Sequence, residues 1–182
     1  MATVVGLDLS LANSGVAVIR DGEVDLRHVR TPAPEDGGVL AVWERIRYSA
    51  IRVVRLVPEG AFVNVEWASY ASKFGQPDER NAHRWLVAGT LAQRGFHVVK
   101  TAPKTRAKYA ADDGNADKED VLEAMRARYP GLVIADDNVA DALALAAMAA
   151  RYLGEPIDGL PTKPQTQVMR GLRWPKREGA TA

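Results

Sequence analysis

Acidic residues stand inside the most apolar segments of this chain, and they limit how it can fold. Asp8 lies within the apolar run 3–9, and Glu66 ends a second run, 61–66. Asp137 and Asp141 lie one helical turn apart at the start of an alanine-rich helix. An ionised carboxylate in an apolar interior costs several kcal/mol unless it is paired or bound to metal. A fold that brings these segments together around a shared cation explains all four acids.

The composition is that of one ordinary globular domain. A chain of 182 residues can bury a real core, and its 47% hydrophobic and 26% charged residues fit that class. The chain has no cysteine, which excludes disulfides and thiolate zinc sites and is compatible with a reducing cytoplasm. We find no signal-peptide pattern, and the longest apolar run, 142–150, is too short to cross a membrane.

The positive charge gathers at the C-terminal end. The segment 161–182 carries a net charge of +4, although the whole chain carries only +1. We therefore divide the chain into a main domain, 1–155, and a basic tail containing proline and glycine, 156–182. Such a tail can hold a polyanion near an acidic site, or it can simply be solvated.

The order of expected elements indicates an α/β fold. Strands over 4–9, 15–20 and 23–29 form an antiparallel meander, because Asp21-Gly22 is a strong hairpin signal. Helices and strands then alternate, and they are expected over 40–57 (helix), 61–66 (strand), 79–94 (helix), 96–100 (strand), 117–129 (helix) and 138–153 (helix). This order predicts a mixed five-stranded sheet, three antiparallel strands plus two parallel ones, flanked by helices. Strand four should lie parallel to strand one, with Asp8 beside Glu66.

These motifs together resemble a known family. The residues that carry the likeness are Asp8-Leu9-Ser10 with Gly15, Val65-Glu66, Gly114-Asn115-Ala116-Asp117-Lys118, and the helix start 137–143. In this order and at these distances they resemble the RuvC-type Holliday-junction resolvases of the ribonuclease H-like superfamily. The tail segments Leu160-Pro161 and Arg173-Trp174-Pro175 resemble the ends of phage or prophage members.

The resemblance implies two-metal hydrolysis of a phosphodiester. Two Mg²⁺ ions, for which Mn²⁺ should substitute, would be held by hard carboxylate oxygens. By resemblance, Asp8 bridges both ions, Glu66 holds one and Asp141 the other. The fourth ligand is either Asn138, which occupies the family's position, or Asp137, which lies on nearly the same helix face. Alternatively, Asp136 or Asp137 only caps the helix.

Other residues are candidates for contact with DNA. By resemblance Lys118 approaches the scissile phosphate, and a solvated helix lysine is the alternative. Tyr70 and Phe74, in a loop after Glu66, can stack on unpaired bases or pack inward. A basic run on the loop after the last strand would neutralise phosphates, and it consists of Lys100, Lys104, Arg106 and Lys108.

The expected function is that of a magnesium-dependent, structure-selective endodeoxyribonuclease, a crossover junction hydrolase. Its substrate would be a four-way junction or other branched DNA, and a two-fold symmetric junction implies a homodimer. The setting would be the cytoplasm of a bacterial cell, with the gene in a phage or prophage. Two alternatives share the fold: a nucleic-acid-binding module that has lost catalysis, and a related nuclease acting on RNA precursors. The chain is too short for the two lobes of an actin-like ATPase, and a four-way junction assay with magnesium separates enzyme from binder.

Overall fold

The computed structural model describes residues 2–68 and 76–175. Its strands and helices, in chain order, are β1 (Val4–Asp8), β2 (Asn13–Arg20), β3 (Glu23–Arg30), α1 (Val39–Leu56), β4 (Phe62–Glu66), α2 (Pro77–Gln93), β5 (His97–Thr101), α3 (Pro103–Ala111), α4 (Lys118–Arg128), α5 (Asp137–Leu153) and α6 (Lys163–Gly171). The predicted elements are present, and two further helices, α3 and α6, join them.

The five strands form one mixed sheet in the order β3-β2-β1-β4-β5. The meander β1-β2-β3 is antiparallel, and β4 pairs in parallel with both β1 and β5. The prediction of the sheet is therefore confirmed. Leu7 pairs with Val65, so that Asp8 and Glu66 are the next residues along neighbouring parallel strands.

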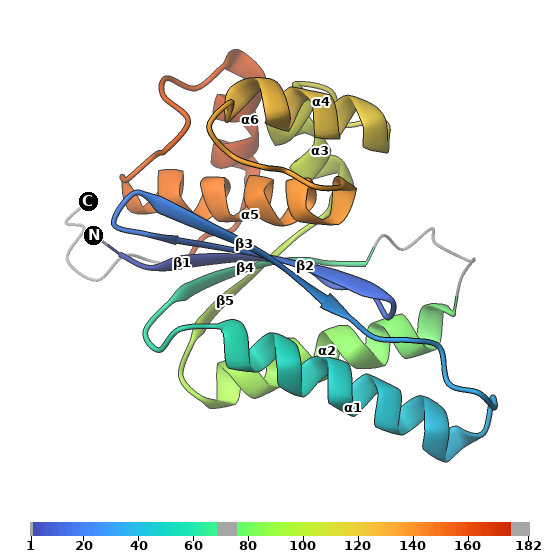
Figure 1. The fold of residues 1–182 in the computed structure, drawn as a ribbon. Coiled ribbons are helices and arrows are strands. Elements are labelled where there is room, and N and C mark those ends of the chain that lie inside the picture. The colour runs from blue at the N-terminus through green and yellow to red at the C-terminus, as the bar shows by residue number, and fades with distance from the viewer. Residues whose placement is uncertain (1, 69–75, 176–182) are drawn as a thin grey trace.

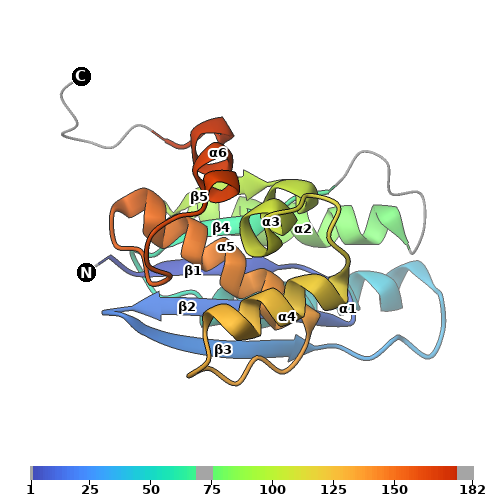
Figure 2. The same ribbon diagram turned by 90° about the horizontal axis from the view of Figure 1, so that it is seen from above.

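The sheet is the middle of three layers (Figure 1). On one face α1 and α2 pack against the apolar side chains Val5, Leu7, Val63 and Val65. On the other face lies α5, and the view from above shows it crossing the central strands beneath α4 (Figure 2). The alternation of side chains along β1 puts Gly6 and Asp8 on the α5 side, opposite Leu7.

Helix α5 is buried along almost its whole length, from Val139 to Ala150. Its alanines are small enough for it to fit between the sheet and the outer helices. A Cβ added to Gly6 would lie 1.9 Å from the carbonyl oxygen of Ala142, and one added to Gly15 would lie 2.1 Å from that of Asn138. These glycines therefore let the first turns of α5 lie directly on β1 and β2.

The basic run after the last strand is not a loop. Lys100 belongs to β5, whereas Lys104, Arg106 and Lys108 lie on α3. Pro103 stands in the first turn of α3, where its missing N–H and fixed φ favour a helix start. The prediction of a loop after β5 was wrong, because Pro103 starts a helix at this place.

Residues 156–175, the described part of the segment that the sequence analysis separates as a tail, fold back onto the body. Helix α6 has a capping box in which Thr162 and Gln165 satisfy each other's backbone N–H groups. The ring of Trp174 stacks on Tyr152 of α5, with centroids 4.6 Å apart and planes within 6° of parallel. A DNA-binding role for this segment stays a prediction.

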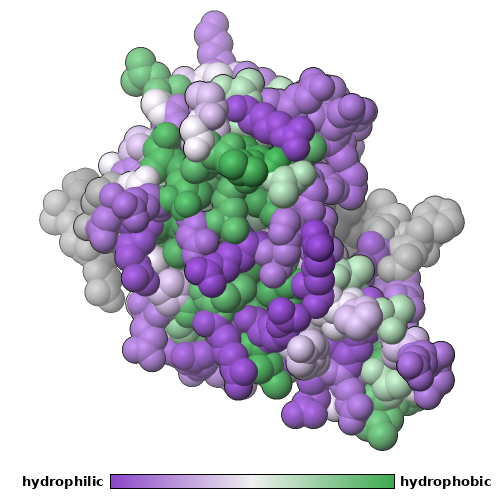
Figure 3. Space-filling view, in the orientation of Figure 1, coloured by the Kyte–Doolittle hydropathy of each residue, from purple (hydrophilic) through white to green (hydrophobic). Residues whose placement is uncertain are grey.

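Hydrophobic residues are also exposed, and Figure 3 shows green atoms over the middle of one face with hydrophilic residues around them. Val39 and Leu40, at the N-terminal end of α1, expose 89% and 68% of their surface. Trp43 and Ile51 of α1 and Trp85 of α2 are exposed as well. Within the described ranges, no helix is both long enough and apolar enough to span a membrane.

Candidate metal centre

Asp8 and Glu66 lie at the C-terminal ends of two neighbouring strands, as the sequence predicted from the topology. Burial raises the pKa of Asp8 well above its usual value, and the charges of Glu66 and Asp141 raise it further. Arg106 and Lys118 act in the opposite direction but do not cancel this effect. The carboxyl group of Asp8 therefore lies where extra positive charge would favour its ionised form.

Asp141 comes from the other side of the sheet and completes the cluster. It lies one turn into α5, and only 6% of its surface is exposed. The pKa of Asp141 is raised to about 7, and burial is the largest cause. The positive charge of Arg106 lowers this pKa, whereas the negative charges of Glu66 and Asp137 raise it. The close approach at Gly6 and Gly15 is what places this helix start against the end of β1.

The structure separates the roles of the consecutive acids before α5. Asp136 is the N-cap, because its carboxylate accepts a hydrogen bond from the backbone N–H of Val139. His28 Nε2 lies 2.8 Å from the same carboxylate, and Asn13 donates a hydrogen bond to it at 3.2 Å. Burial alone would raise the pKa of Asp136, but these hydrogen bonds outweigh burial and lower it.

Asp137 is thereby left free of the capping role. Its carboxylate forms an ion pair with Lys118, whose side chain is 81% exposed at the start of α4. This hydrogen bond raises the pKa of Lys118. The neighbouring Asn138 is half-buried, so the choice between Asp137 and Asn138 as fourth ligand stays open.

Arg106 lies inside the acid cluster, although the sequence analysis grouped it with the DNA-contacting residues. Its Nε donates to Glu66 Oε2 at 2.8 Å, and its Nη1 lies 2.6 Å from Asp141 Oδ1. The side chain of Arg106 is only 11% exposed. One guanidinium therefore joins the carboxylates of β4 and α5, and no sequence pattern predicts which way this α3 residue faces.

The donor set suits a hard divalent cation. Four carboxylates, Asp8, Glu66, Asp137 and Asp141, gather at a partly buried site, and the pKa of Asp8 is raised there although Arg106 and Lys118 lower it. Asp141 Oδ1 is buried and lies outside hydrogen-bond geometry, although Arg106 is close to it. Within residues 2–68 and 76–175, no three acidic or histidine side chains are already grouped closely enough to hold a metal. Arg106 lies between two of the carboxylates that would have to meet.

The three lysines predicted to contact DNA have other partners in the structure. Lys100 Nζ lies 4.4 Å from the ring centre of Trp67 and 5.1 Å from that of Trp85. Lys104 donates to Asn115 at 3.0 Å, and Lys108 donates to Gln167 at 2.9 Å. Tyr70 and Phe74 lie outside the described residues.

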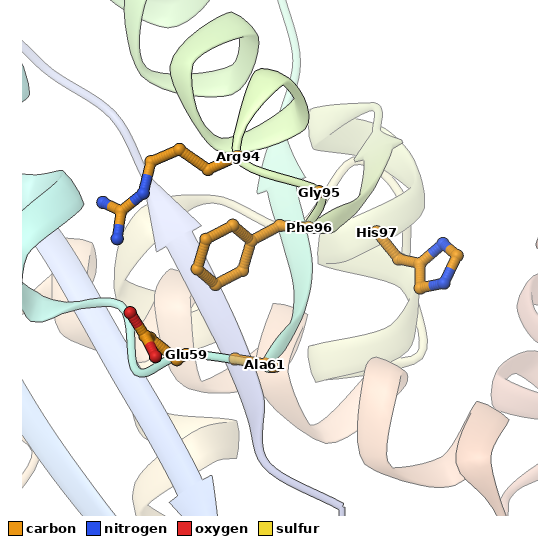
Figure 4. Close-up of a pocket in the computed structure, with 7 residues that line it drawn as sticks. Glu59, Ala61, Arg94, Gly95, Phe96 and His97 are labelled. Carbon is orange, nitrogen blue, oxygen red and sulfur yellow. The ribbon is translucent and has the colours of Figure 1, made fainter.

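A small basic cavity beside Glu66 escaped the sequence analysis. Its volume is about 170 Å³, and Arg80, Asn81 and Arg84 of α2 line it together with Glu66. The spacing of Arg80 and Arg84, four residues apart on one helix, was the signal that could have found it. A larger cavity of about 500 Å³, lined by Glu59, Arg94 and Phe96 among others, lies at the opposite ends of the strands (Figure 4). It is remote from the carboxylates.

Together, the sheet topology and the carboxylates at its centre define a ribonuclease H-like protein with a candidate cation site. No protein-family model matches the chain. Individual relatives match it. The chain is 31% identical over 160 residues to the crossover junction endodeoxyribonuclease RuvC of Paracoccus denitrificans, and the match covers 82% of this chain and 92% of the relative. It is 29% identical to the protein of the same name from Acidiphilium cryptum over 164 residues. The chain belongs to the RuvC family of crossover junction endodeoxyribonucleases.

Solved structures agree on the fold. Thermus thermophilus RuvC matches with a TM-score of 0.62 and 22% identity, and the match covers 84% of this chain and 97% of that one. The same protein in complex with a Holliday junction substrate matches with a TM-score of 0.61 and 23% identity. The ribonuclease H-like fold is therefore confirmed. The relatives named here come from bacteria, and a phage or prophage setting stays a prediction.

Proposed function

We propose that this protein is a metal-dependent, structure-selective endodeoxyribonuclease that cleaves four-way junctions or other branched DNA. The observation that carries the proposal is the convergence of Asp8, Glu66 and Asp141, from three separate segments, at one end of the sheet, where their charges influence one another and one arginine joins two of them. Relatives named crossover junction endodeoxyribonuclease support the reaction. The solved RuvC complex with a Holliday junction supports the substrate.

The proposed cofactor is a pair of Mg²⁺ ions, which Mn²⁺ can replace. When bound, such ions supply an activated water and stabilise the charge that develops on the phosphate. Asp8, at the centre of the cluster, is the proposed shared ligand, with Glu66 and Asp141 on either side. Asp137 or Asn138 completes the set. Lys118, next to Asp137 at the exposed edge, is suited to contact the phosphate that is cut.

A DNA backbone has basic side chains available around this cluster. Lys100, Lys104 and Lys108 lie on β5 and α3, and Arg80 and Arg84 line the small cavity beside Glu66. Positive groups around an acidic centre offset its repulsion of phosphates and make binding salt-dependent. Tyr70 and Phe74 are retained as proposed stacking residues.

A homodimer is proposed as the active form, since a four-way junction has two-fold symmetry and has to be cut twice. The exposed apolar residues of α1 and α2 support this. A groove between these helices has a volume of about 330 Å³ and is lined by Trp43, Ile51 and Leu86 among others. The bacterial relatives favour action in the cytoplasm.

One observation favours a second candidate, a nucleic-acid-binding module without cleavage. Arg106 neutralises two of the proposed ligands, Glu66 and Asp141. A structured RNA among the test substrates addresses the other alternative, an RNA-processing nuclease.

The test is cleavage of end-labelled duplex, forked and four-way DNA and of a structured RNA, each with Mg²⁺, with Ca²⁺ and with EDTA. We expect symmetrical cuts in the four-way junction with Mg²⁺ alone. Asp8→Asn is the control, because it should remove cleavage while the variant still binds the junction. Binding without cleavage by the wild-type protein would favour the module, and cleavage confined to RNA would favour the RNA-processing nuclease.

A further inference from the structure

Arg106 lies where a cation shared by two metal ligands would have to be. It is on the inward face of α3, which begins directly after β5, and β5 is the parallel neighbour of β4. From there its side chain reaches both Glu66, at the end of β4, and Asp141, on α5. These two carboxylates belong to opposite sides of the cluster, and Arg106 joins them directly.

The chemistry of the two kinds of cation explains why they would compete. A guanidinium is always charged, and its planar set of donors matches carboxylate oxygens. A divalent ion uses the same oxygen lone pairs as ligands. If both stayed between Glu66 and Asp141, three positive charges would lie within a few ångströms in a site with little access to water. Arg106 and a divalent ion would therefore exclude each other from this position.

We propose that Arg106 is the built-in counter-ion of the metal-free site, and that a divalent cation displaces it on binding. In the metal-free protein Arg106 is a positioning residue, which holds the carboxylates of Glu66 and Asp141 close to each other and shields them from solvent. Loading the metal breaks both contacts and releases the guanidinium toward the exposed edge of the cluster. The inference rests on the proposed function only in taking Glu66 and Asp141 as metal ligands.

Removing Arg106 should therefore have opposite effects on two properties. Without metal, Glu66 and Asp141 lose their buried partner, and the folded state is destabilised. A divalent cation, on the other hand, no longer has a competitor and binds more tightly. A residue that merely supported the fold would lower stability without raising cation affinity.

Lys118 provides a matched control. It also carries a positive charge in this cluster, but it pairs with Asp137 at the edge and its side chain is 81% exposed. Lys118→Gln removes the same charge as Arg106→Gln, but it frees only the exposed-edge carboxylate of Asp137 and leaves Arg106 between Glu66 and Asp141. The comparison separates displacement of a specific ion pair from a general change in charge.

The experiment measures Mn²⁺ binding by calorimetry, without DNA, for the wild-type protein, Arg106→Gln, Arg106→Lys and Lys118→Gln. Thermal unfolding is followed in EDTA and in Mn²⁺. We expect Arg106→Gln to bind Mn²⁺ about tenfold more tightly, to melt at a lower temperature in EDTA, and to gain more from Mn²⁺ than the wild type. Lys118→Gln should change the affinity by less than about threefold.

Unchanged or weaker Mn²⁺ binding by a folded Arg106→Gln would overturn the proposal. If Arg106→Gln does not fold in EDTA, Arg106→Lys decides, because a single ammonium keeps the charge but cannot join both carboxylates as the fork does. It should bind Mn²⁺ more tightly than the wild type, and equal or weaker binding overturns the idea. Junction cleavage by the wild type is measured separately. Its absence would refute the proposed function, whereas the Mn²⁺ affinities alone judge the role of Arg106.

Discussion

Replacing Asp141 by asparagine should make the metal-free protein more stable while removing its activity. The carboxylate is 6% exposed, and burial, Glu66 and Asp137 all disfavour its charge. Asparagine has nearly the same shape and carries no charge. The substitution therefore removes an electrostatic penalty that the wild-type protein carries whenever no cation is bound.

The pKa of Asp141 sets the size and the pH range of the effect. The folded-state pKa is about 7 against an ordinary 3.8, a difference of about three units at 1.36 kcal/mol each. Below pH 3.8 the group is protonated in both states and contributes nothing. Stability is lost as pH rises from 3.8 to 7, because the unfolded chain ionises first, and the full penalty of about 4 kcal/mol applies above pH 7. Asparagine, however, gives up the ion pair with Arg106, which offsets part of this gain, so we expect a net gain of about 2 kcal/mol at pH 8.

Thermal unfolding in EDTA between pH 4 and pH 8 is the assay. The melting temperature of Asp141→Asn should equal that of the wild type at pH 4 and exceed it by about 4–8 °C at pH 8. Saturating Mg²⁺ should reverse the order at pH 8, because only the wild type gains binding energy from the cation. Asp158→Asn is the control: its buried carboxylate is paired with Arg151, and its loss should destabilise the protein. A lower melting temperature of Asp141→Asn at pH 8 in EDTA would refute the reasoning.

Three further predictions concern the fourth ligand, the C-terminal segment and the helix–sheet contact. Asp137→Asn should strongly lower the cleavage rate and raise the Mg²⁺ concentration that cleavage requires, whereas Asn138→Ala should have a smaller effect. A Mg²⁺ titration of the cleavage rates of both variants tests this, and it would show the reverse order if Asn138 were the ligand. Trp174→Ala should lower the free energy of unfolding in urea by about 2–3 kcal/mol, because it removes the stack on Tyr152. The dependence of DNA affinity on salt concentration should stay unchanged. A weaker salt dependence would mean that Trp174 itself contributes to DNA binding. Gly6→Ala should lower the free energy of unfolding by at least about 3 kcal/mol, because the new Cβ would clash with the backbone of α5. A soluble variant with the melting temperature of the wild type would contradict the packing of α5 on β1.

Patterns of hydrophobicity were sufficient to predict the sheet. The hairpin at Asp21-Gly22 and the apolar runs of β1 and β4 led to the strand order and to the placement of Asp8 and Glu66 at the ends of neighbouring strands. Helices α3 and α6 were missed because both are short and rich in basic residues and proline, which favours a loop interpretation. The capping box from Thr162 to Gln165 was visible in the sequence and predicts α6 correctly once it is used.

The site was less accessible to sequence reasoning. The acids could be found because a buried carboxylate is unusual, whatever surrounds it. The placement of Arg106 could not, because the pattern around it does not tell which face of α3 turns inward. Similarly, only coordinates show that Asp136 takes the capping hydrogen bond, which leaves Asp137 to pair with Lys118.

The order of the acids along the chain has a consequence for biosynthesis. Asp8 lies on β1 and is made before Asp141, which lies on α5, and the start of this helix packs against Gly6 and Gly15 of β1 and β2. A nascent or truncated chain that ends before α5 has Asp8 and Glu66 but neither Asp141 nor the buried helix that covers the sheet. Products of translation that stop before α5 are therefore expected to be inactive, and nuclease activity would begin only after α5 has been made.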